Sequence, residues 1–427
     1  MDKKSTLLNL FVKTTSIQVI GRGLALIAGI CFARVLGPED FGRYSFTLSI
    51  IAIATLPVVA GVQPFIIRQI SRHKVDTEYS NLFGMLRWSL FLILGLSFVS
   101  AVVLMCWLFL QNTNSNISIL VLSAILLIPT RGLLVRQNAV INGLQRPVLA
   151  QVPESIIIPL LSLTVVMLLL FSGQSIDSQS LIYIYLLCSI FSCLIGFLLM
   201  RFAVKAELPV LSKQYHYQTL KWSKMMLPLA LITIVATINS EIAILAMGFF
   251  GLEESIGYFR VAVQGATLLI LGLQSVVMIS GPRIAALYRE ETIEELQSLL
   301  KSSVRLGFSL CLPVALILLL FGKPLISFLF GEAYVPAADL LAILCFAQLV
   351  NVSLGPVGLV LNMTGNEKYA LKAQLLTTCI VLLLLMFLVP DHHGLGATIA
   401  VSTGMIIWNF IMVFDVYRLT GLKTWIH

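Results

Sequence analysis

Two segments of this 427-residue chain resemble each other and lie half a chain length apart. The segment from Leu36 to Phe46, LGPEDFGRYSF, returns about 215 positions later as FGLEESIGYFR, from Phe250 to Arg260. Each copy occupies a short polar gap between two apolar stretches that are long enough to cross a bilayer. A duplicated half in a very apolar chain is typical of carriers whose two repeats enclose a central cavity.

The composition requires lipid as the solvent for most of the exterior. The chain is 58% hydrophobic and 11% charged, and its mean hydropathy is +0.97, whereas soluble domains carry about 25% charged residues. The net charge of +8 does not indicate a nucleic-acid partner, because the basic residues fall between apolar spans and form no single stripe. We therefore expect membrane lipids, and no nucleic acid, around this protein.

Twelve stretches are apolar and long enough to cross a bilayer, which takes about 20 residues of helix. They cover residues 15–36, 45–67, 88–110, 117–140, 150–171, 181–203, 225–249, 258–282, 304–321, 337–362, 371–389 and 396–417. Lipid-facing helices are apolar nearly all round, so length and punctuation define these ranges better than periodicity does. The predicted fold class is an all-α polytopic membrane protein with twelve transmembrane helices.

The positive charges predict the orientation of the chain. With the N-terminus in the cytoplasm, 22 of the 28 Lys and Arg residues fall in inner loops or near the inner ends of spans, four fall in outer loops or near outer ends, and two, Arg22 and Arg131, lie deeper within spans. Cytoplasmic loops carry such an excess of positive charge. Both termini are therefore expected in the cytoplasm, and the halves are parallel repeats around a central cavity. The predicted six-helix lobes cover residues 1–212 (spans 1–6) and 213–427 (spans 7–12).

The cysteines and the N-terminus indicate neither a bound group nor a removed leader. All seven cysteines lie within apolar runs, where a thiol acts as a small packing residue. We expect no disulfide framework, metal or cofactor. The first apolar run leads into a full-length span without a small-residue cleavage site, so we expect no removed signal peptide.

The inner loop 288–303 is predicted to contain a short helix on the membrane surface. Thr292 and Glu295 have the spacing of a capping box, and Ile293, Leu296 and Leu300 form an apolar stripe. The alternative is a plain solvated connector between two spans.

Four segments together resemble the bacterial polysaccharide-biosynthesis flippases of the O-antigen type. They are LGPEDFGRYSF, FGLEESIGYF, LFGEAYVPAADLL (Leu329 to Leu341) and HGLGATIA (His393 to Ala400). The resemblance covers essentially the whole chain, and the order and spacing of the segments carry it more than any single motif does. This family shares its fold group with the multidrug and toxin extruders and with the lipid II flippase, which has two further spans.

The resemblance implies a two-lobed carrier of twelve helices in the bacterial inner membrane. Such a carrier moves an oligosaccharide linked to undecaprenyl pyrophosphate from the inner to the outer leaflet by alternating access. Lipopolysaccharide or a similar surface polysaccharide is built from these units, and a polysaccharide polymerase is an expected partner.

Two pairs of opposite charges lie within predicted spans, where an ionisable residue costs roughly 2.5–3.5 kcal/mol on insertion scales. Arg131 lies 12 residues before the turn at Gly143 and Glu154 lies 11 after it, so antiparallel helices bring them to one depth. Glu241 lies 10 residues before the turn at Gly251 and Arg260 lies 9 after it, so this pair is level too. Each pair is either a structural ion pair or a set of cavity groups that exchange partners during transport.

Polar residues that follow Arg131 favour a wet cavity over a dry packing contact. Asn138, Asn142 and Gln145 come at i+7, i+11 and i+14, so they lie on the same face of the helix. Arg22 lies about six residues inside the first span and has no level partner. It either snorkels to the inner headgroups or faces the cavity and binds the pyrophosphate, which a guanidinium suits because its donors fork onto phosphate oxygens.

These residues divide into two candidate sets, and none is predicted to be catalytic. The candidate substrate-binding residues, for the pyrophosphate or an anionic glycan, are Arg22, Arg131, Asn138 and Arg260. The candidate residues for cation coupling are Glu154 and Glu241. An acid in a cavity can load and release a proton or a sodium ion as access alternates, so coupling is a hypothesis from chemistry.

Two other functions suit the sequence less well than that of a flippase. A multidrug extruder of cationic compounds needs uncompensated acids in its cavity, and the arginines of this chain suit an anionic head group better. A membrane enzyme such as a glycan polymerase needs acid–base groups near a sugar site. All five histidines lie outside the predicted spans and no outer loop is large, so we do not expect an enzyme.

Overall fold

The computed structural model describes residues 3–75, 79–110, 116–208, 215–290 and 292–425. Its described residues are helical with short turns and contain no strand. The chain forms two compact units. Unit 1 comprises Met1–Leu36 and Phe46–Glu241, and unit 2 comprises Gly37–Ser45 and Ile242–His427. The predicted division into lobes at residue 212 stays a prediction.

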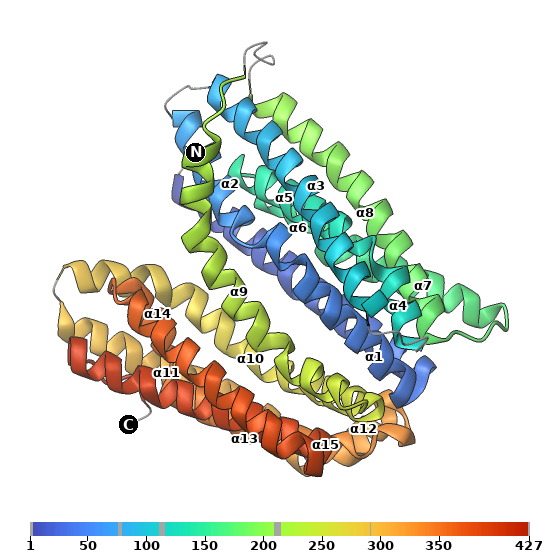
Figure 1. Cartoon of the computed structure of the whole chain (residues 1–427). Coiled ribbons are helices and arrows are strands. Elements are labelled where there is room, and N and C mark those ends of the chain that lie inside the picture. The colour runs from blue at the N-terminus through green and yellow to red at the C-terminus, as the bar shows by residue number, and fades with distance from the viewer. Residues whose placement is uncertain (1–2, 76–78, 111–115, 209–214, 291, 426–427) are drawn as a thin grey trace. The chain divides into compact units, whose positions relative to one another are not determined.

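Unit 1 is built around α5, which packs against α2, α3 and α8. Its helices are α1 (Lys3–Val59), α2 (Val62–Val75), α3 (Tyr79–Leu110), α4 (Asn116–Ala124), α5 (Leu127–Gly143), α6 (Pro147–Gln151), the π-helix η1 (Val152–Ile157), α7 (Ile158–Phe171), α8 (Ser178–Glu207) and most of α9 (Thr219–Phe249), as Figure 1 shows. Neighbouring helices approach α5 closely because α5 has a glycine at position 132. A Cβ on Gly132 would lie 2.5 Å from Val58 Cγ1 and 2.9 Å from Ile93 Cγ2.

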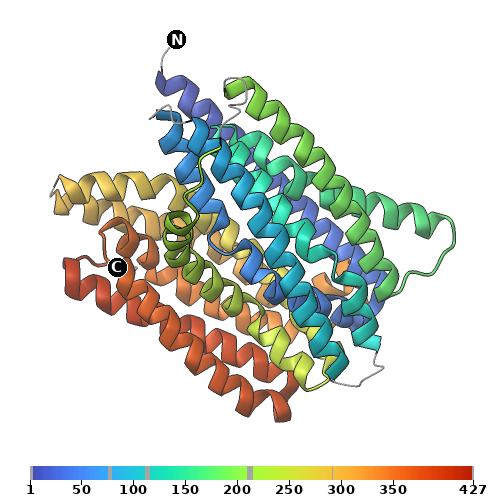
Figure 2. The ribbon, with the colours of Figure 1, turned by 45° about the horizontal axis from the view of Figure 1, so that its top comes forward.

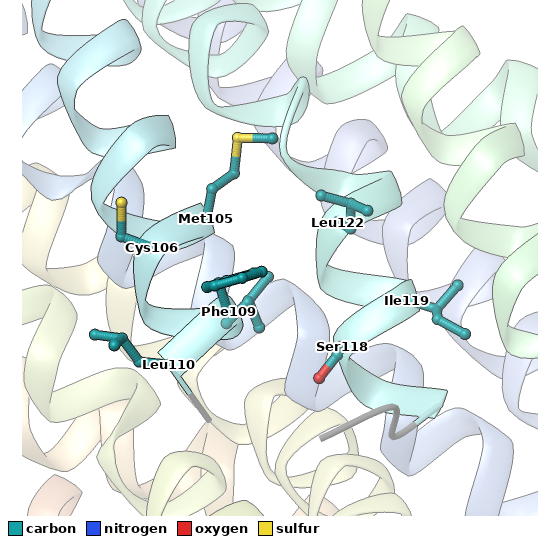
Figure 3. Close-up of a pocket in the computed structure, with 8 residues that line it drawn as sticks. Met105, Cys106, Phe109, Leu110, Ser118, Ile119 and Leu122 are labelled. Atoms are coloured by element: carbon teal, nitrogen blue, oxygen red, sulfur yellow. The ribbon is translucent and has the colours of Figure 1, made fainter. Parts of the chain in front are cut away.

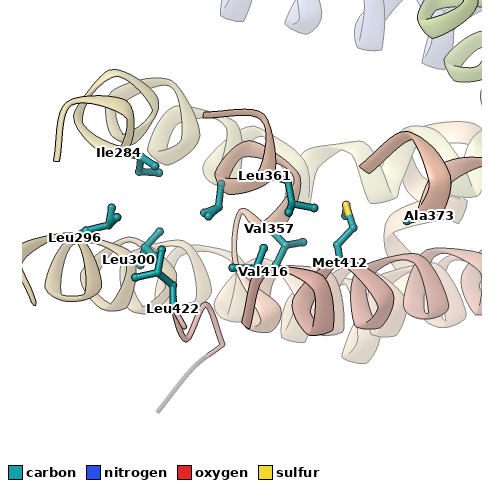
Figure 4. Packing of buried hydrophobic residues seen from close by; sticks show 10 residues of the cluster. Ile284, Leu296, Leu300, Val357, Leu361, Ala373, Met412, Val416 and Leu422 are labelled. Carbon is teal, nitrogen blue, oxygen red and sulfur yellow. The ribbon is translucent and has the colours of Figure 1, made fainter. Parts of the chain in front are cut away.

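Unit 2 packs its long helices side by side. They are α10 (Glu253–Arg289), α11 (Ile293–Leu320), α12 (Gly322–Phe330), the 3-10 turn η2 (Glu332–Tyr334), α13 (Ala337–Leu354), α14 (Val357–Met363) and α15 (Glu367–Thr420). The pair α10 and α11 is visible in Figures 1 and 2. A buried apolar cluster joins α10, α11, α14 and α15 at one end of this unit (Figure 4).

The prediction of a separate short helix over 288–303 is wrong. Residues from Ile293 onward form the first turns of α11, which continues to Leu320. The predicted capping box does not form, because the Thr292 hydroxyl donates to the carbonyl oxygen of Leu287, 3.2 Å away, and caps no α11 amide. The stripe has a packing role instead: Leu296 and Leu300 are fully buried in the cluster of Figure 4.

Nine helical stretches in the described part of the chain are long and apolar enough to cross a membrane. Two of them are far longer than a bilayer requires, and each is broken near its middle. The breaks are at Gly37 (φ 73°, ψ 172°) in α1 and at His393 (φ 48°, ψ −126°) in α15. In α15 the chain reverses direction at His393, as the contacts on either side of it show: Gly396 packs on the Leu388 carbonyl oxygen and Gly404 packs on Val381. The protein therefore has many spans, and the number twelve stays a prediction.

Candidate functional site

The helix α5 is buried along most of its length, with a polar stripe left accessible. Arg131, Asn138 and Asn142 are part-exposed, whereas their neighbours Gln137 and Ile141 are buried. Residues spaced by seven and four share one face of a helix. An exposed arginine or amide is costly against acyl chains, so this face is suited to a water-filled space.

The structure brings Arg131 and Glu154 together. The positive charge of Arg131 acts on the Glu154 carboxyl group. Glu154 lies in η1, one turn of π-helix, and π-helical turns are frequent at functional sites. Glu154 is exposed and Arg131 is part-exposed. A ligand therefore has access to the pair.

Arg22 reaches the same level of unit 1 from another helix. A Cβ on the preceding residue, Gly21, would lie only 2.7 Å from Ser155 Cβ and 2.9 Å from its carbonyl oxygen. α1 therefore crosses η1 in close contact beside Glu154. Arg22 itself is exposed. The arrangement gathers two arginines and one acid at one level of a membrane-embedded unit, with an excess of positive charge.

Asn138 has a partner that the sequence did not reveal. Gln63 of α2 donates from Nε2 to Asn138 Oδ1 at 3.2 Å, and Asn138 Nδ2 donates to the Ala150 carbonyl oxygen at 3.0 Å. Gln63 is exposed. Its position within an apolar span is a signal that sequence reasoning could have used, because a glutamine there needs a polar environment.

Glu241 is held within unit 1 by a serine. Ser49, in the second arm of α1, donates from Oγ to Glu241 Oε2 at 2.6 Å. Arg260 lies on α10 in unit 2 and is part-exposed. The predicted pair of Glu241 and Arg260 spans the two units and stays a prediction. Ser49 is fully buried, and nothing in its sequence neighbourhood distinguishes it from other serines in spans.

A further arginine of α5 is buried on the opposite side from the stripe. Arg136 is 7% exposed and bonds neutral groups only: Ser89 Oγ at 3.1 Å, the Leu86 carbonyl oxygen at 2.8 Å and Met200 Sδ at 3.7 Å. These bonds fasten α5 to α3 and α8. Charge in a span is normally a sign of function, but the enclosed position of Arg136 gives it a structural role.

An apolar groove lies between α3 and α4 in unit 1 (Figure 3). Its volume is about 710 Å³, and its lining is Met105, Cys106, Leu108, Phe109, Leu110, Ser118, Ile119 and Leu122. A lining so poor in polar groups cannot bind a charged head group. No cluster of His, Cys, Asp and Glu that could hold a metal ion occurs among the residues that the structure describes.

Comparison with known proteins identifies the family. The family model described as polysaccharide biosynthesis protein matches residues 31–339. This chain belongs to the polysaccharide biosynthesis protein family. The predicted family is thereby confirmed.

This polysaccharide biosynthesis protein is similar in sequence to two named proteins. The capsular polysaccharide biosynthesis protein CapF of Staphylococcus aureus is 25% identical over 192 residues, which are 45% of this chain and about half (47%) of that protein. The probable low-salt glycan biosynthesis flippase Agl15 of Haloferax volcanii is 22% identical over 413 residues, covering 94% of this chain and 81% of the relative.

Solved structures share the fold of this polysaccharide biosynthesis protein. An inward-facing multidrug resistance MATE family transporter of the MOP superfamily has a TM-score of 0.77 at 14% identity, covering 96% of this chain and 98% of its own. The lipid II flippase MurJ, in an inward closed conformation, has a TM-score of 0.75 at 16% identity, covering 95% and 87%. At such identities the likeness concerns the fold alone. The shared fold and the apolar helices together indicate a multi-pass membrane protein of the predicted all-helical class.

Proposed function

We propose that this protein moves an oligosaccharide linked to undecaprenyl pyrophosphate across the bacterial inner membrane by alternating access. Its family membership and a full-length relative described as a probable glycan flippase support the proposal. The observation that carries it is the arrangement of charges in unit 1, where Arg131 acts on Glu154 and the residue before Arg22, Gly21, packs against Ser155. An excess of guanidinium charge inside a membrane span is suited to an anionic head group.

The proposed roles follow from the chemistry of each side chain. The forked donors of Arg22 and Arg131 bind pyrophosphate oxygens, and Arg260 adds a third cation from the second half of the chain. Asn138 contacts the glycan. These groups are worth more to a phosphate in a low-dielectric cleft than in water, because screening there is weak.

The acids provide a means of coupling transport to a cation gradient. Glu154 can exchange its contact with Arg131 for a proton or a sodium ion when the substrate takes the arginine. Glu241, bonded to Ser49, is the second candidate. Collapse of the proton and sodium gradients should then stop transport into vesicles, and unchanged transport would remove coupling from the proposal.

The proposed architecture is twelve helices in two lobes, residues 1–212 and 213–427, with both termini in the cytoplasm. The breaks at Gly37 and His393 support it, since each divides an overlong helix into two arms of spanning length. A polysaccharide polymerase that takes the substrate at the outer face is the proposed partner. No catalytic step is assigned to this chain.

The experiment that tests the function is deletion of the gene, followed by analysis of the lipid-linked oligosaccharides. The proposal predicts that they build up on the inner leaflet while surface polysaccharide is lost, and that the full-length gene restores export. Normal surface polysaccharide in the deletion strain would contradict it.

A multidrug extruder is the alternative, since its fold matches that of a multidrug resistance transporter. Under that alternative, expression of the protein would raise resistance to cationic dyes. Under the proposed function it would not, because the arginines of unit 1 repel cations.

A further inference from the structure

The amide pair Gln63 and Asn138 joins α2 to α5 at an accessible place. Gln63 is the second residue of α2, and Asn138 lies five residues before the end of α5 at Gly143. Gln63 is exposed and Asn138 is part-exposed. Asn138 uses its amide on Gln63 and Ala150, whereas Gln63 makes one side-chain hydrogen bond, to Asn138. The carbonyl oxygen of Gln63 and its second amide hydrogen are thus available to a ligand.

We propose that Gln63, supported by Asn138, is a subsite for the hydroxyl groups of neutral sugars, an inference that rests on the proposed function. An amide presents one donor and one acceptor side by side, and adjacent sugar hydroxyls offer the complementary pair. Neither residue carries a charge, so this subsite favours neutral over acidic sugars. Asn138 is seven residues from Arg131, about 10 Å along the helix. A head group whose pyrophosphate contacts Arg131 therefore reaches the amides with its first sugars.

The test uses binding to the purified full-length protein in nanodiscs. One probe is undecaprenyl pyrophosphate without sugar, and the other is the same lipid with a neutral N-acetylhexosamine disaccharide. The wild-type protein is expected to bind the glycosylated probe more tightly. Gln63→Met, which keeps the volume and loses the hydrogen bonds, should weaken that binding about 3- to 10-fold and leave the bare lipid unaffected. Gln179→Met, at a part-exposed glutamine of α8 whose Nε2 likewise donates one side-chain hydrogen bond, to the Tyr183 hydroxyl at 3.1 Å, is the control.

The outcomes separate the two levels of the proposal. If the wild-type protein binds neither probe, the proposed function fails and the sugar subsite fails with it. If it binds both probes equally, or if Gln63→Met weakens both alike, the subsite alone is overturned.

A second inference comes from the four sequence segments that carry the family resemblance, because residues of all four pack against one another in unit 2. Phe41, of the first segment, and Tyr258, of the second, lie edge-on to Tyr334 of the third, with ring centroids 6.4 and 6.3 Å away. Phe41 and Tyr334 are 2% and 1% exposed. From the fourth segment, a Cβ on Gly394 would contact Ser255 at 3.4 Å.

The backbones of the first two segments also touch. A Cβ on Gly42 would overlap the carbonyl oxygen of Glu253, and a Cβ on Gly257 would overlap that of Pro38. We name residues 37–45 the strap. The strap belongs to unit 2, whereas the chain on either side of it, up to Leu36 and from Phe46, belongs to unit 1. At its start, Gly37 has φ 73° and no neighbouring atom within 4 Å of its Cβ position.

We infer that the strap is a permanent anchor in unit 2. The two arms of α1, which lie before and after the strap, pivot about it during transport. A gate that opens in every cycle needs a contact that separates easily. The contact of the strap is instead as buried as a hydrophobic core. Its separation would expose Phe41 and Tyr334 to water. Freedom of movement is found at Gly37, where glycine tolerates the left-handed backbone and packing is absent.

Cysteine reactivity tests whether the strap separates from the rest of unit 2 during transport. Ser45 lies in the strap, is 2% exposed and differs from cysteine by one atom. In a chain whose seven native cysteines are replaced, Ser45→Cys is treated with a membrane-permeant maleimide in growing cells. Glu39→Cys, exposed on the same strap, is the matched control. The anchor predicts rapid labelling at position 39 and at least 10-fold slower labelling at position 45, with full labelling of both after denaturation.

Labelling of Ser45→Cys at a rate close to that of Glu39→Cys would overturn the anchor. Full labelling of the denatured protein shows that both cysteines are reactive. A folding defect in the Ser45 variant is recognised separately, by a loss of its thermal transition.

Discussion

Gly42 and Gly257 meet where the two sequence repeats pack against each other: a Cβ on Gly42 would lie 3.2 Å from the backbone nitrogen of Gly257. Their places in the two copies of the motif differ by one position, because Gly42 aligns with Ile256 and Gly257 aligns with Arg43. Each lies against the backbone of the other copy, so the duplication that marks the sequence is also a contact in the fold. Side chains at either position would force the two backbones apart.

Alanine at Gly42 or Gly257 is therefore expected to destabilise the protein by about 1–3 kcal/mol, the usual cost of overpacking. The measurement is the thermal transition of the purified protein in detergent. Gly23→Ala is the matched control, because nothing lies within 4 Å of its Cβ position. Equal transition temperatures for Gly42→Ala and Gly23→Ala would show that the contact is not tight.

Arg22 is expected to be required for export. Arg22→Ala should abolish surface polysaccharide, since the pyrophosphate loses a forked donor, and Arg22→Lys should retain part of it, since the charge remains. The readout is surface polysaccharide at matched protein levels, with Arg34→Ala, at the other end of the same span, as the control. Normal export by the Arg22→Ala variant would mean that this arginine only snorkels.

Arg136 and Ser89 are expected to show strong coupling in a double-mutant cycle. Ser89→Ala removes an acceptor from a buried guanidinium, so it should lower the free energy of unfolding by about 1–3 kcal/mol. In an Arg136→Met background the same change should have little effect, because no donor is left unpaired. Additive effects in thermal or denaturant unfolding would contradict the bonding described for Arg136.

Asp177 caps α8 and is expected to make stability depend on acidity. Its side chain accepts a hydrogen bond from the Ser180 amide at 3.0 Å, and the bonds from Ser180 lower the pKa of the Asp177 carboxyl. A lowered pKa in the folded state means that the stabilisation is full above the unfolded pKa, about 3.9, and is lost as pH falls through the folded value. Asp177→Ala should cost about 1 kcal/mol at neutral pH.

The measurement for Asp177 is thermal unfolding between pH 7 and pH 3. The difference between wild type and Asp177→Ala should shrink as the pH falls. Asp177→Asn keeps the cap without the charge and should show a smaller dependence on pH. A constant difference between wild type and alanine over this range would exclude the carboxylate as the cap.

The equal depth of Arg131 and Glu154 could be predicted because the rise per residue of a helix is fixed. Counting residues from a turn therefore measures depth. Helical spacing predicted the polar stripe of α5, and the gap between the predicted spans 371–389 and 396–417 is where the chain reverses, near His393. The family followed from loop segments whose order is preserved, although the reason for their preservation, the packing around Tyr334, is a tertiary contact that no spacing records.

Partners across helices could not be predicted in the same way. Gln63 reaches Asn138, Ser49 reaches Glu241 and Ser89 reaches Arg136 because particular helices are neighbours, and apolar spans carry little periodicity that would specify neighbours. The capping box at Thr292 failed for a related reason: its spacing allows the cap, but the hydroxyl finds the Leu287 carbonyl oxygen of the preceding helix instead.

The central claim is that the protein carries an anionic lipid-linked glycan between leaflets, and the most direct measurement is made in proteoliposomes. The full-length protein is reconstituted with undecaprenyl-pyrophosphate-linked oligosaccharide, and an impermeant glycosidase is added outside. The account predicts that wild-type protein exposes the entire pool of glycan to the enzyme, while vesicles with Arg22→Ala protect the inner-leaflet share. Wild-type vesicles that protect as much glycan as protein-free vesicles would contradict it.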